Sequence, residues 1–156
     1  MNKKYNLLFL IALFILSLAT KAQINPDFFV DNGTCKCPDA NFGDTGTVTI
    51  NGQQKTFTKR NRTQLDALIA NDQQDPEIAL TCTSGITSMN GLFSNEQNFN
   101  QNINHWDLSQ VTTMRFMFLN AISFNQPLNN WDVSQVTSMD DMFAFADSFN
   151  QPINSW

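Results

Sequence analysis

Two aspartates with matching surroundings are the first residues of this chain that could do chemistry. Asp107 and Asp132 each follow a tryptophan, precede a serine by two positions and are 25 residues apart. If their segments stack as neighbouring layers, the carboxylates lie about 5 Å apart, a spacing that could hold a cation or act as a glycosidase pair. An aspartate so placed more often accepts hydrogen bonds from the backbone amides of its own turn. We therefore expect both carboxylates to be structural.

The single histidine and the three cysteines offer little for catalysis or metal binding. His105 has no serine or cysteine nucleophile in a plausible array, and its expected outward position beside Trp106 indicates a solvated surface residue. Cys35, Cys37 and Cys82 lack the spacing of a zinc ligand set. The chain also has no phosphate-binding loop, glycine-rich fingerprint or basic patch. The sequence predicts a protein that is not an enzyme and that uses no metal or cofactor.

The cysteines are better suited to a disulfide, which an exported protein can form. Cys35 and Cys37 are too close in the chain to close a comfortable ring, so one of them is expected to pair with Cys82. We take Cys37 and Cys82 as the candidate pair, with Cys35 as the open alternative. Such a bridge would tie the start of the mature chain to the first repeat.

The elements that position these residues come from a repeat. Phe99 to Ser123 and Phe124 to Ser148 align without a gap, with 15 identities in 25 positions, and "FNQPINSW" begins a further copy. In the second half of each unit, hydrophobic residues at i, i+3, i+4 and i+7 indicate a short amphipathic helix. In the second copy, Phe124 to Ser148, these residues are Met139, Met142, Phe143 and Ala146.

The first half of each unit has the spacing of a leucine-rich-repeat strand, L-x-x-L-x-L, with Trp131 in a leucine position. One strand and one helix per 25 residues predict an α/β fold, a right-handed leucine-rich-repeat solenoid whose units bury their apolar faces on one another. Because side chains alternate along a strand, the neighbours of Trp131 and Val133 are expected on the outer, concave face. The candidate ligand-binding residues on that face are His105, Asp107, Ser109, Asn130, Asp132 and Ser134.

At these residues the chain resembles a known family. The stretch "FNQPLNNWDVSQVTSMDDMF" is similar to the repeat of BspA-type leucine-rich repeat surface proteins, a group that overlaps the mycoplasma-type lipoprotein repeat domain. The motifs F-N-Q, W-D-V-S, V-T-x-M and M-F recur in order and in phase over about Ser84 to Trp156. The resemblance implies a bacterial secreted or cell-surface protein, in a family where some members attach to host or matrix proteins and no catalytic role is typical.

Residues 40–77 have a different composition and predict an N-terminal cap made of a hairpin and a helix. Asn51-Gly52 between two β-rich runs is a strong hairpin signal. Thr63 is the expected helix cap and Asn71 the expected stop. The solenoid then occupies residues 78–156, and since its last strand motif is incomplete at Trp156 we expect it to be truncated.

The first 22 residues read as a signal peptide, with Lys3 and Lys4, an apolar run, and small residues before cleavage after Ala22. Residues 23–39 are expected to be an extended segment. Cleavage would remove three of the nine basic residues and none of the fourteen acidic ones, which leaves a formal charge of −8 (6 − 14). This charge disfavours nucleic acid and anionic lipid as partners.

These features together predict a secreted or cell-surface interaction protein, exported through a cleaved signal peptide, that binds another protein in an adhesion-type role. The partner would be a host or matrix protein or another cell-surface protein, with a glycan as a further candidate and no membrane insertion after cleavage. The alternative is a carbohydrate-binding or structural envelope module, since outward asparagine, aspartate and glutamine side chains could bind glycans.

Overall fold

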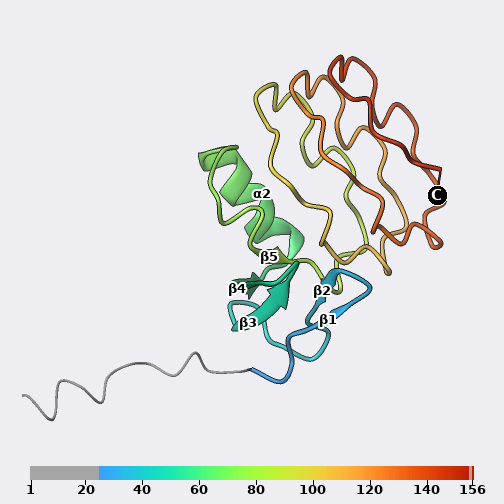
Figure 1. Ribbon diagram of the computed structural model, residues 1–156. Helices are drawn as coiled ribbons and strands as arrows, with labels where there is room; N and C mark the ends of the chain where they lie inside the picture. The colour runs from blue at the N-terminus through green and yellow to red at the C-terminus, as the bar shows by residue number, and fades with distance from the viewer. Residues whose placement is uncertain (1–24, 155) are drawn as a thin grey trace, which may run out of the picture.

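The computed structural model describes residues 25–154 and residue 156. The predicted signal peptide, residues 1–22, lies outside the described residues. Two small sheets and one helix occupy the N-terminal half of the described chain, and layers without regular secondary structure form the rest (Figure 1). The elements are β1 (Phe29–Asp31), β2 (Thr34–Lys36), β3 (Thr45–Ile50), β4 (Gln53–Lys59), α2 (Arg62–Asn71) and β5 (Thr81–Cys82).

The predicted hairpin is present as β3 and β4, which pair antiparallel, while β5 adds to β4 in parallel. Its turn residues Asn51 and Gly52 have φ angles of 52° and 75°, values that asparagine and glycine adopt most readily. Val48, Ile50 and Phe57 are buried together, as the alternation predicts. This sheet covers a small core of its own, separate from the main core of the repeats.

The segment 23–39 was predicted to be extended, but its described part, residues 25–39, contains the β1–β2 hairpin. Asn32 and Gly33 at its turn have φ angles of 48° and 79°, the same left-handed pair as Asn51 and Gly52. The strands are only three residues long, and the two apolar residues of β1, Phe29 and Val30, are exposed. No alternating apolar pattern therefore marked the hairpin in the sequence.

The helix α2 ends at Asn71 as predicted, but it begins two residues earlier than the expected Thr63 cap. Asn61 is the actual N-cap: its side chain accepts a hydrogen bond from the Gln64 N–H, and the Gln64 side chain accepts one from the Asn61 N–H, both at 2.9 Å. This reciprocal pair satisfies two free amides of the first turn. Leu65 and Ile69 then bury against the repeats, so the helix closes one end of their core.

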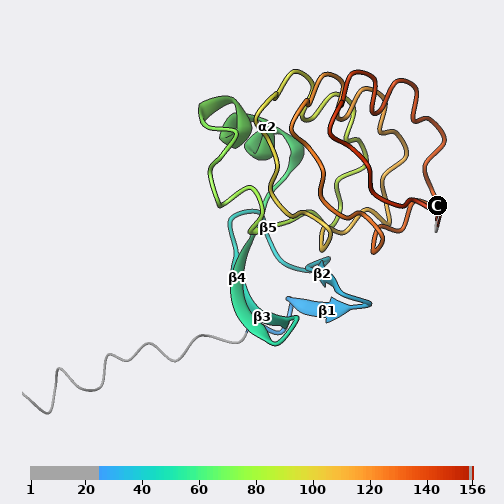
Figure 2. The same ribbon diagram turned by 45° about the horizontal axis from the view of Figure 1, so that its top comes forward.

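The predicted fold class, a right-handed leucine-rich-repeat solenoid of alternating strand and helix, is wrong. Beyond β5, in residues 84–154, the chain forms turns, and the ladder pairings there are isolated bridges from Ser88 to Thr113 and from Thr113 to Ser138. Figure 2 shows the repeat segments as irregular layers lying side by side, with α2 at one end and the C-terminus at the other. We call residues 74–98, 99–123 and 124–148 the first, second and third segments.

Backbone conformation explains why the i, i+3, i+4 pattern does not produce helices. Asp141 and Phe145 have φ angles of 53° and 58°, and left-handed residues four apart interrupt a right-handed helix. The Met142 N–H donates to the Met139 carbonyl three residues back, whereas the Phe118 N–H donates to the Met142 carbonyl of the next segment. Successive turns thus place the same side chains inward that a helix would.

Aromatic columns join the segments through the main core. Phe93, Phe118 and Phe143 stack with ring centroids 5.5 and 5.4 Å apart, nearly parallel. A second column contains Phe99, Phe124 and Phe149 at 5.7 and 5.9 Å. Because every segment places the same ring at the same position, each layer buries the previous one.

Candidate functional site

The six predicted ligand-binding residues range from buried to exposed. His105 and Asp107 are buried, with 7% and 6% exposure, so their predicted outward, solvated positions are wrong. The β1–β2 hairpin folds over the second segment and covers them: the Cys35 N–H donates to the His105 carbonyl at 2.8 Å. Asp132 and Ser134, one segment further on, lie beyond the hairpin and are exposed, while Ser109 and Asn130 are partly buried.

The Asp107 carboxylate is the centre of a cluster that we call the junction cluster, formed with Lys36, Ser84 and Ser109. Lys36 Nζ donates to Asp107 Oδ1 at 2.8 Å, and the Ser109 hydroxyl donates to the same oxygen at 2.7 Å. The Ser84 hydroxyl donates to Oδ2. Burial by itself raises the pKa of Asp107, but these hydrogen bonds outweigh burial and hold the pKa below its ordinary value.

The junction cluster joins three parts of the chain, which indicates a structural role. Lys36 comes from β2, Ser84 follows β5, and Asp107 lies in the second segment. Ser84 Oγ also accepts from the Cys37 N–H at 2.9 Å, next to the disulfide that the structure places between Cys37 and Cys82. The cluster and the disulfide therefore fasten the β1–β2 hairpin to the repeats at the same place.

Cys35 is the remaining free cysteine among the described residues and is fully buried. Burial, with a smaller effect of the Asp107 charge, raises the pKa of its thiol to about 12. A thiol with such a pKa contains almost no thiolate at neutral pH, and the thiolate is the reactive form. Cys35 is thus an inert core residue and not a nucleophile.

The His105 side chain is fixed by two contacts of its ring. Nε2 lies 2.6 Å from the Ala79 carbonyl, which can only accept, so the proton is on Nε2. The ring meets Phe57 edge to face at 5.1 Å. Burial lowers the pKa of His105 despite the Ala79 hydrogen bond, which raises it. At neutral pH the ring is therefore neutral, with Nδ1 as an acceptor.

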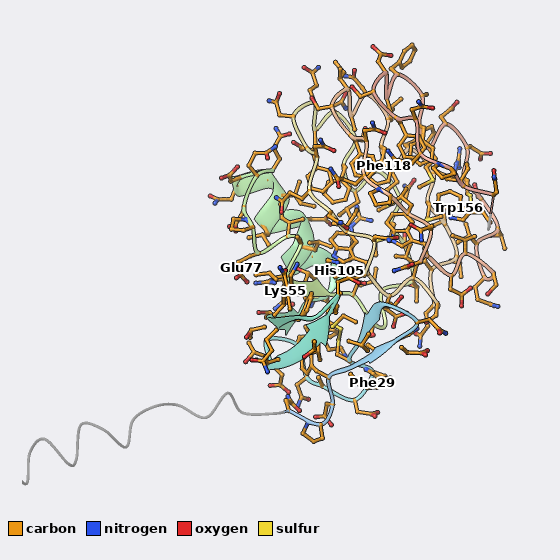
Figure 3. All side chains as sticks on the ribbon, in the orientation of Figure 1. Phe29, Lys55, Glu77, His105, Phe118 and Trp156 are labelled. Atoms are coloured by element: carbon orange, nitrogen blue, oxygen red, sulfur yellow. A yellow bond between two sulfur atoms is a disulfide. The ribbon has the colours of Figure 1, made fainter. Side chains whose placement is uncertain are left out.

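A small polar pocket opens beside His105, between the two hairpin turns and the repeats. We call it the junction pocket; its volume is about 80 Å³. Figure 3 shows Lys55, on β4, and His105 near one another at this place. The lining residues are Gly33, Ile50, Asn51, Lys55, Asn102, Asn104, His105 and Asn130. Of the predicted site residues, the pocket thus brings together His105 and Asn130.

Asp132, the counterpart of Asp107, has only the turn contact expected for both. Its Oδ1 accepts from the Ser134 N–H at 3.0 Å, and hydrogen bonds from Ser134 lower its pKa. The equivalent bond from the Ser109 N–H to Asp107 is 3.2 Å long. The turn prediction is therefore confirmed for both aspartates, whereas the surroundings of Asp107 come from the hairpin above it.

Two further observations concern the described part of the chain. Among residues 25–154 and 156, no three His, Cys, Asp or Glu side chains gather closely enough to hold a metal ion. Within the same residues, no helix has both the length and the apolar character needed to cross a membrane.

Two cations lie beside the predicted site that the sequence pattern did not indicate, Lys36 and Lys55. The Asn32-Gly33 turn was the available signal for Lys36, because it predicts a hairpin that would bring β2 back onto the chain. For Lys55 there was no comparable signal, since its position depends on how the β3–β4 sheet docks on the repeats.

The fold and the site define a protein fastened by a disulfide, in which the β1–β2 and β3–β4 hairpins cover the first layers of a 25-residue repeat. We call the part that holds these two hairpins, residues 25–59, the head. Residues 63–156 match the family described as "Mycoplasma protein of unknown function, DUF285", and the chain belongs to that family. The match agrees with the mycoplasma-type part of the resemblance, while the BspA-type leucine-rich repeat is not confirmed. No curated protein and no solved structure matches the chain.

Proposed function

We propose that this is an exported bacterial protein that acts at or outside the cell surface as an interaction protein, without enzymatic activity. Its partner is another protein, of a host, a matrix or a cell surface, and the contact is of the adhesion type. Export follows from the signal peptide that the sequence predicts, and an outside location suits a protein fastened by a Cys37–Cys82 disulfide.

The observation that carries the proposal is the conformation and exposure of Phe145. Its side chain is 73% exposed, and its φ is 58°. The equivalent residues one and two segments earlier are Asn120 and Asn95, with φ angles of 57° and 69°. Asparagine tolerates this left-handed conformation, whereas phenylalanine is strained there by an amount on the order of 1 kcal/mol.

The fold therefore gains nothing from phenylalanine at this position, and an exposed aromatic ring suits binding to a protein. Aromatic residues are common among the few side chains that supply most of the energy of a protein interface. Phe116 shares the left-handed conformation: its φ is 56°, it stands where the preceding segment has Gly91, and its ring is partly buried. Ile122 adds another exposed apolar side chain, at 37%, to the second segment.

The test is the substitution Phe145→Asn, which restores the residue of the equivalent positions. Because asparagine fits the left-handed conformation, we expect the free energy of unfolding to stay the same or rise by about 1 kcal/mol. Binding to the responding members of a panel of immobilised matrix and cell-surface proteins should fall at least tenfold. Phe42→Asn is the control, because Phe42 is also exposed, at 58%, but lies in the head. Unchanged binding by Phe145→Asn contradicts the proposal.

The contact surface of this proposal is not the predicted concave face, where two of the six predicted residues, His105 and Asp107, are buried. Asp132 and Ser134 stay exposed and, with Asn130, remain candidates for a secondary contact. The alternative function, carbohydrate binding, is favoured by one observation, the amide-rich junction pocket. A glycan array with Phe145→Asn distinguishes the two functions. The variant leaves the junction pocket unaltered, so it should keep any glycan binding while it loses protein binding.

A further inference from the structure

Lys55 places a positive charge on the rim of the junction pocket without a neutralising partner. No described carboxylate lies within ion-pair distance of Lys55, whereas the ion pairs found involve Lys36, Arg60, Arg62 and Arg115. The side chain is partly buried, and its charge reaches His105, whose pKa it lowers slightly. In a chain with formal charge −5, an unpaired cation facing a pocket is a site for an anionic group.

The asparagines of the pocket are held in place before any ligand arrives. Asn104 Oδ1 accepts from the Asn130 N–H at 3.0 Å, and Asn104 Nδ2 donates to Asn129 Oδ1 at 3.2 Å. Asn102 Oδ1 accepts from the Asn104 N–H at 3.0 Å. These bonds leave other donors and acceptors of the amide groups free, and fixed amides of this kind recognise hydroxyl groups.

His105 also lines the pocket, and one nitrogen of its ring is a spare acceptor. Its Nε2 proton is committed to the Ala79 carbonyl, so Nδ1 is unprotonated, and no described residue donates to it. A neutral ring adds no second positive charge, and it can accept a hydroxyl proton. The pocket thus combines one cation with several neutral groups that bind hydroxyls.

The β1–β2 turn closes one side of the pocket, with Gly33 against the Asn130 side chain. A Cβ atom at Gly33 would lie 2.6 Å from Asn130 Nδ2, closer than real contacts allow. With glycine at this position, the turn packs directly against the Asn130 side chain, which would have to move to admit a Cβ atom. The pocket is built from the head and from two repeat segments, so its shape depends on their docking.

We propose that the junction pocket binds a carboxylate-bearing sugar, with the carboxylate on Lys55 and the ring hydroxyls on the asparagine amides and His105. A volume of about 80 Å³ accommodates a carboxylate and the adjoining part of one ring, so the ligand is the end of an acidic saccharide and not the middle of a chain. This site is separate from Phe145 and goes beyond protein binding.

The experiment is a titration of the whole mature protein with glucuronate, followed by amide and histidine-ring NMR signals. Glucose, acetate and inorganic phosphate are the comparison probes at equal concentration and ionic strength. We expect glucuronate to shift the signals of Gly33, Asn102 and His105, and to bind at least tenfold more tightly than each comparison probe. Equal binding of acetate or phosphate shows an unspecific anion site and overturns the proposal, as does the absence of shifts in the pocket.

Two charge-matched variants complete the test. Lys55→Gln should reduce glucuronate binding at least tenfold, while Arg115→Gln, which removes the same charge from an exposed ion pair outside the pocket, should not. Equal losses in both variants would mean that net charge alone attracts the sugar. Glucuronate binding should survive in Phe145→Asn, so failure of this proposal and failure of the proposed protein contact give different results.

Discussion

The two equivalent aspartates show how much the surroundings of one residue decide. Asp107 and Asp132 occupy the same position of the repeat and make the same turn bond to a serine amide. Only Asp107 lies under the β1–β2 hairpin, where it gains Lys36 and Ser84 as partners. Its carboxylate is nearly inaccessible, whereas that of Asp132 faces solvent. The repeat thus predicts the turn, and the hairpin adds the buried ion pair.

Asp107→Asn should therefore destabilise the protein much more than Asp132→Asn. Removing the charge leaves Lys36 without its partner at a mostly buried site, so we expect a loss of about 2 to 4 kcal/mol in the free energy of unfolding. The matched change at Asp132 should cost less than about 1 kcal/mol. Urea unfolding at pH 7 measures both values, and equal losses would contradict the role given to the junction cluster.

The Asp107 carboxylate also predicts that the stability of the protein depends on pH. The native pKa of Asp107 is lower than its unfolded value, so its stabilisation is complete above the unfolded pKa, roughly 4. This stabilisation is lost as the pH falls through the native pKa of Asp107, because the folded and the unfolded protein then both bind the proton. The difference in stability between the unaltered protein and Asp107→Asn should accordingly shrink below about pH 4.

Among the secondary-structure elements, those fixed by local turn and cap residues could be predicted from the sequence. Those whose conformation depends on packing against the rest of the protein could not. The Asn51-Gly52 turn identified β3 and β4, and the end of α2 at Asn71 was found. The expected repeat helices do not form, because residues such as Phe116 and Phe145 adopt left-handed conformations that their types do not suggest. Inward hydrophobic positions were still found, since the turns have nearly the same period as a helix.

Gly33 tests whether the β1–β2 hairpin depends on its close approach to the third segment. Alanine there meets two costs, the left-handed φ of 79° and the overlap with Asn130, so Gly33→Ala should cost about 2 to 3 kcal/mol. Gly52→Ala is the control, because its φ is 75° and no atom lies within 4 Å of the added carbon. It should cost about 1 kcal/mol. Thermal unfolding distinguishes the two, and equal shifts in Tm would mean that the contact with Asn130 is unimportant.

Across the whole molecule, burial declines from the middle segment toward the C-terminal layer. Phe118 and Phe124 are fully buried between neighbouring layers, whereas Phe143, Phe149 and Trp156 are only partly buried. The backbone hydrogen bonds between segments also end here: the amides of Met114 and Phe118 donate to carbonyls of the third segment, whereas among the described residues the equivalent amides of Met139 and Phe143 have no backbone acceptor. Equivalent residues therefore contribute unequally to stability, according to how many layers enclose them.

The phenylalanine column provides the test of this gradient. Phe118→Ala removes a ring that stacks on Phe93 and on Phe143 and leaves a closed cavity, so it should cost about 3 to 5 kcal/mol. Phe143→Ala should cost about 1 to 2 kcal/mol less, because its ring already contacts solvent and the site can collapse. Guanidinium unfolding measures both losses. If Phe143→Ala proved equally destabilising, the last layer would be as tightly enclosed as the middle one, and stability would not follow the order of the layers.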